Sequence, residues 1–405
     1  MTLLRNVTLV RPNAVISNGW LLTTGERITA FGSSADEVPG NEFANSTSET
    51  FDLGGAYIVP GFVDMHVHGG GGASFTTGDP QEALRAIDFH RAHGTTTNIA
   101  SGVTAAIPDL EKQVSELAGL VEDGTLAGLH LEGPFLSTAR CGAHDPALLR
   151  APELPLLEQL VAAGRGTIRM VTLAPELPGG LDAVKWLADQ GIIAAVGHTD
   201  ADAPDARSAL NRGASVATHL FNAMRGLQHR DPTAANALLS DNEAILELVN
   251  DGFHVDPTLI SLVFKMVGAG RVALITDAVS AAGMPDGAYQ LGPLDIQVAG
   301  GIARLDDGET IAGSTMTMDV AFRRAVQVIG LPIEQASLAA SLTPARAIGV
   351  DDRVGSIEVG KIADLVVLDS ELCVAAVMSR GSWFGDPTLP KPVNASLSRT
   401  QQPDS

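Results

Sequence analysis

The sequence has little cysteine and no long apolar run. Only Cys141 and Cys373 occur in 405 residues, which excludes a disulfide framework and a zinc site built from paired thiolates. Any metal must therefore be held by nitrogen and oxygen. No stretch of about 18 apolar residues is present, and the first residues lack the apolar core of a secretory signal peptide. We expect a cytoplasmic protein without a membrane partner.

Basic residues are scarce relative to acidic ones. Lys and Arg number 26 and Asp and Glu 47, which gives a formal net charge of −21. Nucleic-acid binding requires a basic footprint, so we expect no nucleic-acid partner. A small anion is not excluded. Surface charge is screened beyond about 8 Å at physiological ionic strength, and a few local cations in a pocket can still bind phosphate.

What the chain has is ample apolar material, with 45% hydrophobic and 18% charged residues. Its length fits one α/β barrel with a smaller domain appended. Short β-like runs separated by Gly, Asn and Ser fill residues 1–57, and residues 350–383 return to β character. We predict that these two segments form a small β-sandwich domain, that residues 58–349 form the barrel, and that residues 384–405 form a loose tail.

From residue 57 on, short apolar strands alternate with amphipathic helical stretches, which indicates βα units and a parallel sheet. Eight strands are predicted, near residues 58–68, 95–102, 127–133, 168–174, 192–198, 214–220, 246–251 and 272–277. The helices predicted around them include 80–93, 108–121, 181–190, 204–212, 257–267, 317–329 and 333–347. Eight such units close a (β/α)8 barrel of the TIM type.

Potential metal ligands recur where these strands end. His66 and His68 close the first strand, and residues two apart in a strand point to the same side, so both imidazoles can reach one ion. The other candidates, at the ends of the third, fifth, sixth and eighth strands, are Glu132, His198, His219 and Asp277. Barrel enzymes place their chemistry at this face. Imidazole with carboxylate suits Zn²⁺ or Fe²⁺, so the pattern predicts a metal hydrolase.

An amide is a poor electrophile and water a poor nucleophile, so hydrolysis requires activation of both the amide and the water. A metal ion makes water nucleophilic near neutral pH by lowering its pKa from 15.7 toward about 7. We expect Asp277 to take the proton during attack and to return it to the amine nitrogen as the tetrahedral intermediate collapses. His130 shares a strand face with Glu132, and we interpret it as support for the site rather than as a ligand.

Several motifs together resemble those of a known group of enzymes. The H-x-H pair, Asp277 and the segment 355–369 (GSIEVGKIADLVVLD) resemble the amidohydrolase superfamily. Further motifs resemble, within it, the family of N-acetylglucosamine-6-phosphate deacetylases; they are His130–Phe135, Gly142–Pro146, Gly197–Thr199, Thr218–Met224, Asp251–Asp256, Thr276–Ala278 and Ala312–Thr315. The resemblance spans about residues 1–370. It implies hydrolysis of an N-acetylated amino-sugar phosphate to the amine and acetate.

The resemblance also implies roles for single residues. Glu132, His198 and His219 match the ligands of one metal, and His66 with His68 match a second site, with Glu132 as the bridge. One or two divalent ions per subunit are therefore expected, Zn²⁺ first and Fe²⁺, Co²⁺ or Mn²⁺ as alternatives. Asp277 matches the catalytic aspartate beside the metal.

The substrate contacts are implied in the same way. His144 is expected near the substrate carbonyl, where it stabilises the oxyanion with the metal. Arg230 and His254 are expected to reach the substrate from the neighbouring subunit of a homodimer. The remaining substrate-binding residues implied are Cys141, Asn222, Ala223, Ala312 and Gly313.

Two other functions stay open. One is another amidohydrolase, acting on a related N-acyl sugar phosphate or on a cyclic amide; many cyclic amidases of the dihydroorotase or hydantoinase kind bridge their metals with a carboxylated lysine at the fourth strand end. Here that strand ends in 173–176 (LAPE), without lysine. The other alternative is a non-catalytic barrel that serves as a binding scaffold. Such a chain is expected to lose metal ligands, and none is missing.

Overall fold

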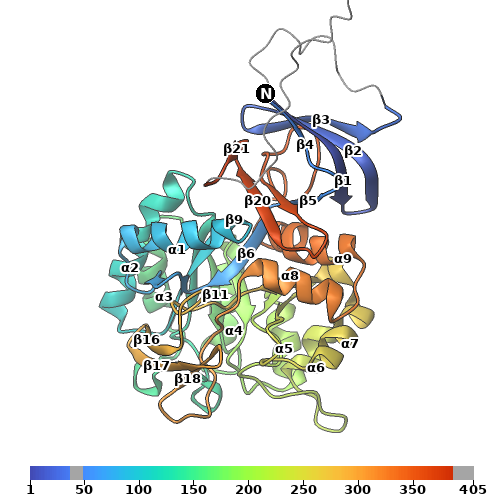
Figure 1. Ribbon diagram of the computed structural model, residues 1–405. Coiled ribbons are helices and arrows are strands. Elements are labelled where there is room, and N and C mark those ends of the chain that lie inside the picture. The colour runs from blue at the N-terminus through green and yellow to red at the C-terminus, as the bar shows by residue number, and fades with distance from the viewer. Residues whose placement is uncertain (37–48, 386–405) are drawn as a thin grey trace, which may run out of the picture.

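The computed structural model describes residues 1–36 and 49–385, and a parallel barrel makes up most of it (Figure 1). Its strands are β6 (Phe62–Val67), β9 (Thr95–Gly102), β10 (Gly128–Glu132), β11 (Ile168–Leu173), β12 (Ile193–Val196), β13 (Val216–Ala217), β14 (Ile245–Val249) and β15 (Val272–Ile275). Each strand pairs in parallel with the next one along the chain. The predicted TIM-type barrel is confirmed.

The barrel is closed between its first and last strands by single hydrogen bonds. The Asp277 N–H donates to the His66 carbonyl over 2.9 Å. Asp64, fully buried in β6, accepts from the backbone N–H and the hydroxyl of Thr276, just beyond β15. Burial raises the pKa of Asp64 to about 7. These bonds hold the end of β15 against the end of β6, so Asp277 lies beside His66 and His68.

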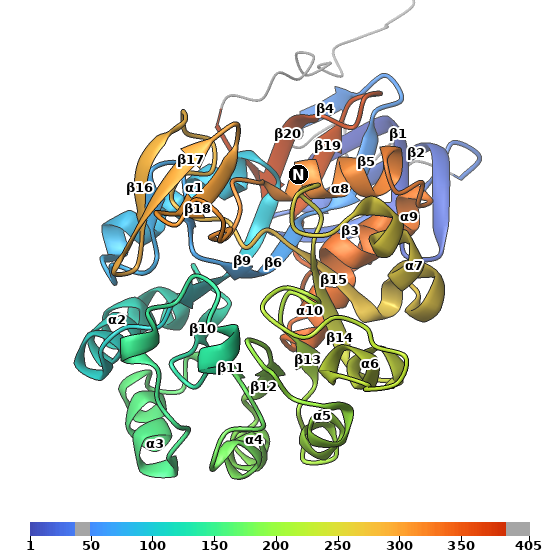
Figure 2. The same ribbon diagram turned by 90° about the horizontal axis from the view of Figure 1, so that it is seen from below.

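Helices surround the strands, as Figure 2 shows for the series from α2 to α6. Their bounds are α1 (Pro80–Ala92), α2 (Ile107–Glu122), α3 (Leu154–Ala163), α4 (Gly180–Asp189), α5 (Ala203–Leu210), α6 (Ala234–Ser240), α7 (Pro257–Val267) and α8 (Met318–Gln327). Asp79, Asp202 and Asp256 cap α1, α5 and α7 through their side chains, and a proline follows in the first turn. The predicted starts of these three helices are correct to within one residue.

Two predicted elements are divided in the structure. The strand predicted at 58–68 is broken at Gly61, where an added Cβ would collide with the side chain of Thr96; β5 (Tyr57–Pro60) pairs outside the barrel. The helix predicted at 333–347 consists of α9 (Ile333–Ser337), a π-helical turn (Leu338–Leu342) and α10 (Thr343–Ala347). Pro344 has no N–H to donate, which interrupts the regular helical ladder.

Both ends of the described chain meet in one mixed sheet above the barrel (Figure 1). Its further strands are β1 (Thr2–Arg11), β2 (Ala14–Thr24), β3 (Arg27–Ser33), β4 (Glu49–Asp52), β19 (Leu365–Leu368), β20 (Val374–Ser379) and β21 (Ser382–Trp383). Strand β19 runs antiparallel to β5, with Leu365 opposite Pro60. Leu9, Ile58 and Val367 contribute to the separate core of this sheet. The predicted tail lies largely outside the described residues.

A three-stranded antiparallel sheet, which the sequence analysis did not predict, follows the last barrel strand. It consists of β16 (Gly287–Leu291), β17 (Leu294–Ala299) and β18 (Ile302–Leu305). Its inward residues join Val103 and Val279 in a small core of their own. Among the helices of residues 1–36 and 49–385, none combines the length and hydrophobicity of a membrane span.

Phe62 offers a test of the packing between β6 and α8. Its ring is fully buried, with the ring centroid 5.3 Å from that of Phe322. We expect Phe62→Ala to lower the free energy of unfolding by about 3 to 5 kcal/mol, because it leaves a cavity. Phe253→Ala, at a ring that is 52% exposed, should change it by about 0.5 kcal/mol or less. Urea denaturation measures the free energy of unfolding of both variants. Similar losses in the two variants would contradict the assignment of Phe62 to the core between β6 and α8.

Candidate active site

The six predicted ligand residues meet at the C-terminal end of the barrel. His66 lies in β6, Glu132 ends β10, and the other four stand one or two residues beyond their strands. All six are buried, with exposed fractions of 7% or less. They form two groups in which the ligand atoms lie within 4.8 Å of one another. The strand-end rule therefore located these side chains correctly in space.

Three of these residues have a backbone conformation that L-amino acids seldom adopt. The φ angles are +47° at His198, +27° at His219 and +51° at Asp277. Each such residue costs about 1 to 3 kcal/mol, and strain of this kind clusters at functional sites. The strained turns point the three side chains back over the strand ends, toward one another.

The first group has Glu132 at its centre. Glu132 Oε1 lies 3.0 Å from His198 Nε2 and 2.9 Å from His219 Nε2, and the two ring nitrogens are 3.0 Å apart. The other carboxylate oxygen, Oε2, lies 3.2 Å from His68 Nε2. Glu132 thus presents one oxygen to each group.

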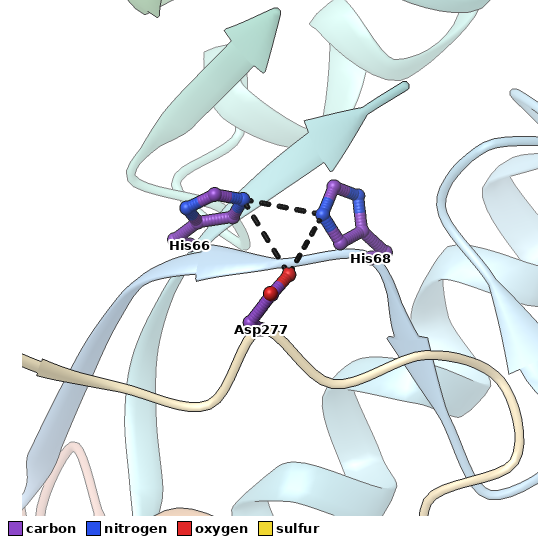
Figure 3. A group of neighbouring side chains, drawn as sticks. All are labelled: His66, His68 and Asp277. Atoms are coloured by element: carbon purple, nitrogen blue, oxygen red, sulfur yellow. Dashed lines mark hydrogen bonds and ion pairs between the residues drawn. The ribbon is translucent and has the colours of Figure 1, made fainter. Parts of the chain in front are cut away.

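The second group contains His66, His68 and Asp277 (Figure 3). The Nε2 atoms of the two histidines are 3.2 Å apart. Asp277 Oδ1 lies 3.2 Å from His68 Nε2 and 3.7 Å from His66 Nε2. Burial acts to lower the pKa of His68, but hydrogen bonds with Asp277 and Glu132 raise it to about 9. The pocket therefore favours positive charge at this point.

Hydrogen bonds on the far side of the rings decide which nitrogen faces the site. His68 Nδ1 lies 3.2 Å from the Ser101 carbonyl oxygen, and His198 Nδ1 lies 3.0 Å from the Arg140 carbonyl oxygen. A carbonyl only accepts, so each Nδ1 carries hydrogen and, when the ring is neutral, each Nε2 turns a lone pair inward. Lone pairs about 3 Å apart repel unless a proton or a cation lies between them. This arrangement of nitrogen and carboxylate donors fits a divalent metal ion.

Glu247 is a buried carboxylate that the sequence analysis missed. Its Oε2 lies 3.0 Å from His66 Nδ1 and accepts the His219 backbone N–H over 3.0 Å. It therefore fixes the ring of one group and the backbone of the other. The signal available in the sequence was a single acidic residue inside the apolar strand β14.

His130 lies behind the two groups and contributes no atom to either. Its Nδ1 is 2.9 Å from Ser101 Oγ, and its Nε2 is 2.8 Å from Thr172 Oγ1. Burial holds the pKa of His130 well below its usual range, so the ring is neutral. The ring packs edge-on against His66, which is consistent with a supporting role.

A cavity of about 340 Å³ opens in front of the two groups. Asn222, Ala223, Gly313 and His144 line it, as expected. His144 Nδ1 accepts the Thr104 backbone N–H over 3.2 Å, so the hydrogen of this ring is on Nε2 and points into the site. Residues that line the cavity without having been predicted as site residues are Gly142, Ala143, Phe221, Leu291, Thr310 and Ile311.

Two of the predicted substrate-contact residues do not line the cavity. Cys141 is partly buried but does not line the cavity, whereas its neighbour Gly142 does. Ala312 is fully buried in the core of the β16–β18 sheet, and only Gly313 faces the cavity. His254 lines the cavity of its own chain, and its Nδ1 lies 2.7 Å from Asp251 Oδ2; its contact with the substrate of the neighbouring subunit stays a prediction.

Arg230 lies outside the cavity of its own chain. It is exposed, in the loop between β13 and α6. In the same loop Arg225 pairs with Asp231.

Comparison with known proteins agrees with this site. The profile of the amidohydrolase family matches residues 57–384, and the chain belongs to that family. It is therefore a hydrolase of a metal-dependent superfamily.

The individual relatives are deacetylases of hexosamine phosphates. The N-acetylgalactosamine-6-phosphate deacetylase of Escherichia coli O157:H7 is 38% identical over 329 residues, which cover 80% of this chain and 86% of the relative. The N-acetylglucosamine-6-phosphate deacetylase of Bacillus subtilis is 33% identical over 94% of this chain and 96% of its own length. The structure of the Mycobacterium smegmatis N-acetyl-D-glucosamine-6-phosphate deacetylase is 44% identical, with a TM-score of 0.89 over 95% of this chain and 100% of that one.

The two groups predict different metal contents in variants. We expect His198→Ala to remove tight metal binding and activity. His66→Ala combined with His68→Ala should remove one metal equivalent and leave partial activity. Elemental analysis after dialysis measures the equivalents, and His229→Ala, at an exposed histidine outside the cavity, is the control. A wild-type protein that never holds more than one equivalent would refute the second metal.

Proposed function

We propose that the chain removes the acetyl group from N-acetyl-D-glucosamine 6-phosphate and releases D-glucosamine 6-phosphate and acetate. The observation that carries this proposal is a cavity lined by His144 and by members of both candidate metal-binding groups, Asp277 among them. The relatives named above support the choice of substrate. In addition, a variant of the Mycobacterium smegmatis enzyme, 45% identical to this chain, has been solved in complex with N-acetyl-D-glucosamine 6-phosphate.

We further propose one or two zinc ions per chain. Glu132, His198 and His219 would hold the first, and His66 with His68 the second, beside Asp277. Glu132 can bridge them, because its two oxygens face different groups. A divalent cation held there would activate water near neutral pH and polarise the amide carbonyl.

Residues of the chain itself then transfer the protons. Hydrogen bonds and the charges of the nearby histidines overcome the effect of burial and hold the pKa of Asp277 well below its usual range, so Asp277 is an ionised base. It accepts the proton of the attacking water and later passes it to the amine nitrogen. The His144 Nε2–H donates to the carbonyl oxygen as negative charge develops on it.

The phosphate end of the substrate would lie near Asn222, Ala223 and His254. No lysine or arginine is among the described residues that line this cavity. A doubly charged phosphate therefore lacks a permanent counter-ion within one chain. We propose a homodimer in which the partner subunit's Arg230 supplies it.

Substitution of Asp277 tests the reaction. We expect Asp277→Asn to lower turnover of N-acetylglucosamine 6-phosphate by at least about 100-fold with metal content preserved, since acid and base steps contribute about 10² to 10⁴. Both proteins are first stripped of metal and reloaded with zinc. The galactosamine and mannosamine isomers and a cyclic amide serve as comparison substrates. Near-normal turnover in the variant removes Asp277 from the mechanism, and a preference for the cyclic amide refutes the deacetylase assignment.

Substitution of Arg230 tests the phosphate contact. Arg230→Ala should raise KM for the 6-phosphate much more than it changes action on unphosphorylated N-acetylglucosamine, because a charge-assisted contact is lost selectively. Arg207→Ala, at an exposed arginine on α5, controls for the change in net charge. Mixing Arg230→Ala with Asp277→Asn protein should restore activity at low substrate concentration, since one site of each hybrid dimer is intact. No recovery after proven subunit exchange would place Arg230 outside the partner's site.

A further inference from the structure

A second cavity lies at the end of the barrel opposite the candidate active site. Its volume is also about 340 Å³. Thr96, Thr97 and Arg169 line it at the N-terminal starts of β9 and β11, whereas the active site lies at the C-terminal strand ends. Ser379 and Arg380 line it from the small sheet. The cavity therefore joins the barrel to the sheet, and the proposed deacetylation gives it no role.

Four arginines line this cavity. Arg91 comes from the end of α1, Arg169 from β11, Arg353 from the segment after α10, and Arg380 from the turn after β20. Only two acidic residues, Asp123 and Asp364, line it with them. The lining thus has two more positive than negative charges, in a chain whose net charge is −21.

The ion pairs of these arginines leave most of their donors unused. Arg91 pairs with Asp88 at 2.6 Å, Arg353 with Asp352 at 3.8 Å, and Arg380 with Glu26 at 3.3 Å. A guanidinium has five N–H donors, and exposed pairs of this kind contribute about 0 to 1 kcal/mol. Within the part of the chain that the structure describes, no side chain of these arginines forms an ion pair with Asp123 or Asp364, and Arg169 forms none at all. Asp364 accepts the backbone N–H of Arg380 over 2.7 Å.

We propose that this cavity binds the phosphate group of a small molecule. Guanidinium groups match phosphate oxygens in geometry and charge, and the volume falls within the range of small-molecule sites. Because the ligand would contact the barrel and the small sheet together, its binding stabilises their association. The ligand is either inorganic phosphate or a phosphorylated metabolite.

Calorimetric titration of the metal-loaded protein at low ionic strength tests this site. The probes are inorganic phosphate and D-fructose 1,6-bisphosphate. We expect wild type to bind phosphate at two sites per chain, and Arg169→Gln combined with Arg353→Gln to weaken one of them at least tenfold. The deacetylase kcat/KM should not change, because neither arginine lines the active site. Tighter binding of the bisphosphate identifies a metabolite site, and tighter binding of phosphate identifies an inorganic phosphate site.

The control is Arg207→Gln combined with Arg212→Gln, which alters the net charge equally at arginines outside the cavity. Arg169 and Arg353 are exposed, so their replacement removes no core packing, and far-UV circular dichroism verifies the fold. Identical isotherms for wild type and the cavity variant would overturn the proposal. An equal loss in the control would overturn it too, because binding would then reflect net charge alone. Neither outcome depends on the proposed deacetylation.

Discussion

The closure of the barrel between β6 and β15 is the constraint on which the site depends. Asp64 and Thr276 hold the two strands together in the interior, and the Asp277 N–H bonds to the His66 carbonyl at the rim. These hydrogen bonds join residues more than 200 positions apart and place the carboxylate of Asp277 beside the imidazoles of His66 and His68. The packed barrel also offsets the strain of the turns at His198 and His219, where φ is positive.

Because the carboxylate and the imidazoles are buried, the site favours the binding of cations. Carboxylates and facing imidazole nitrogens are costly to bury unless a positive charge joins them. Without metal, protons fill that need, which explains the pKa of about 9 at His68. His198 differs, because burial lowers its pKa to about 4, so that its nitrogen is free for a metal. Metal binding at this site would therefore be linked to stability, since an ion that binds only the folded chain favours folding.

The barrel and the position of the six candidate metal ligands could be predicted because strand ends and residue spacing map directly onto space. Contacts that depend on packing could not. Glu247 is a lone acid in an apolar strand, and nothing local shows that it points toward His66. The β16–β18 sheet alternates exposed and buried residues, but it lies beyond the βα repeat on which the prediction relied. The resemblance implied Ala312 as a substrate contact, whereas its side chain lies in the core of this sheet.

The two ends of the site differ in how far a single chain completes them. A short motif identifies a residue near the phosphate but does not say which subunit it serves, and His254 lines the cavity of its own chain, with its Nδ1 beside Asp251. The acyl end of the site is therefore built within one chain, from residues at strand ends. The phosphate end has polar groups but no lysine or arginine among the described lining residues. If the partner supplies that charge, the subunit interface governs recognition of the phosphate, while the chemistry of the amide stays within each barrel.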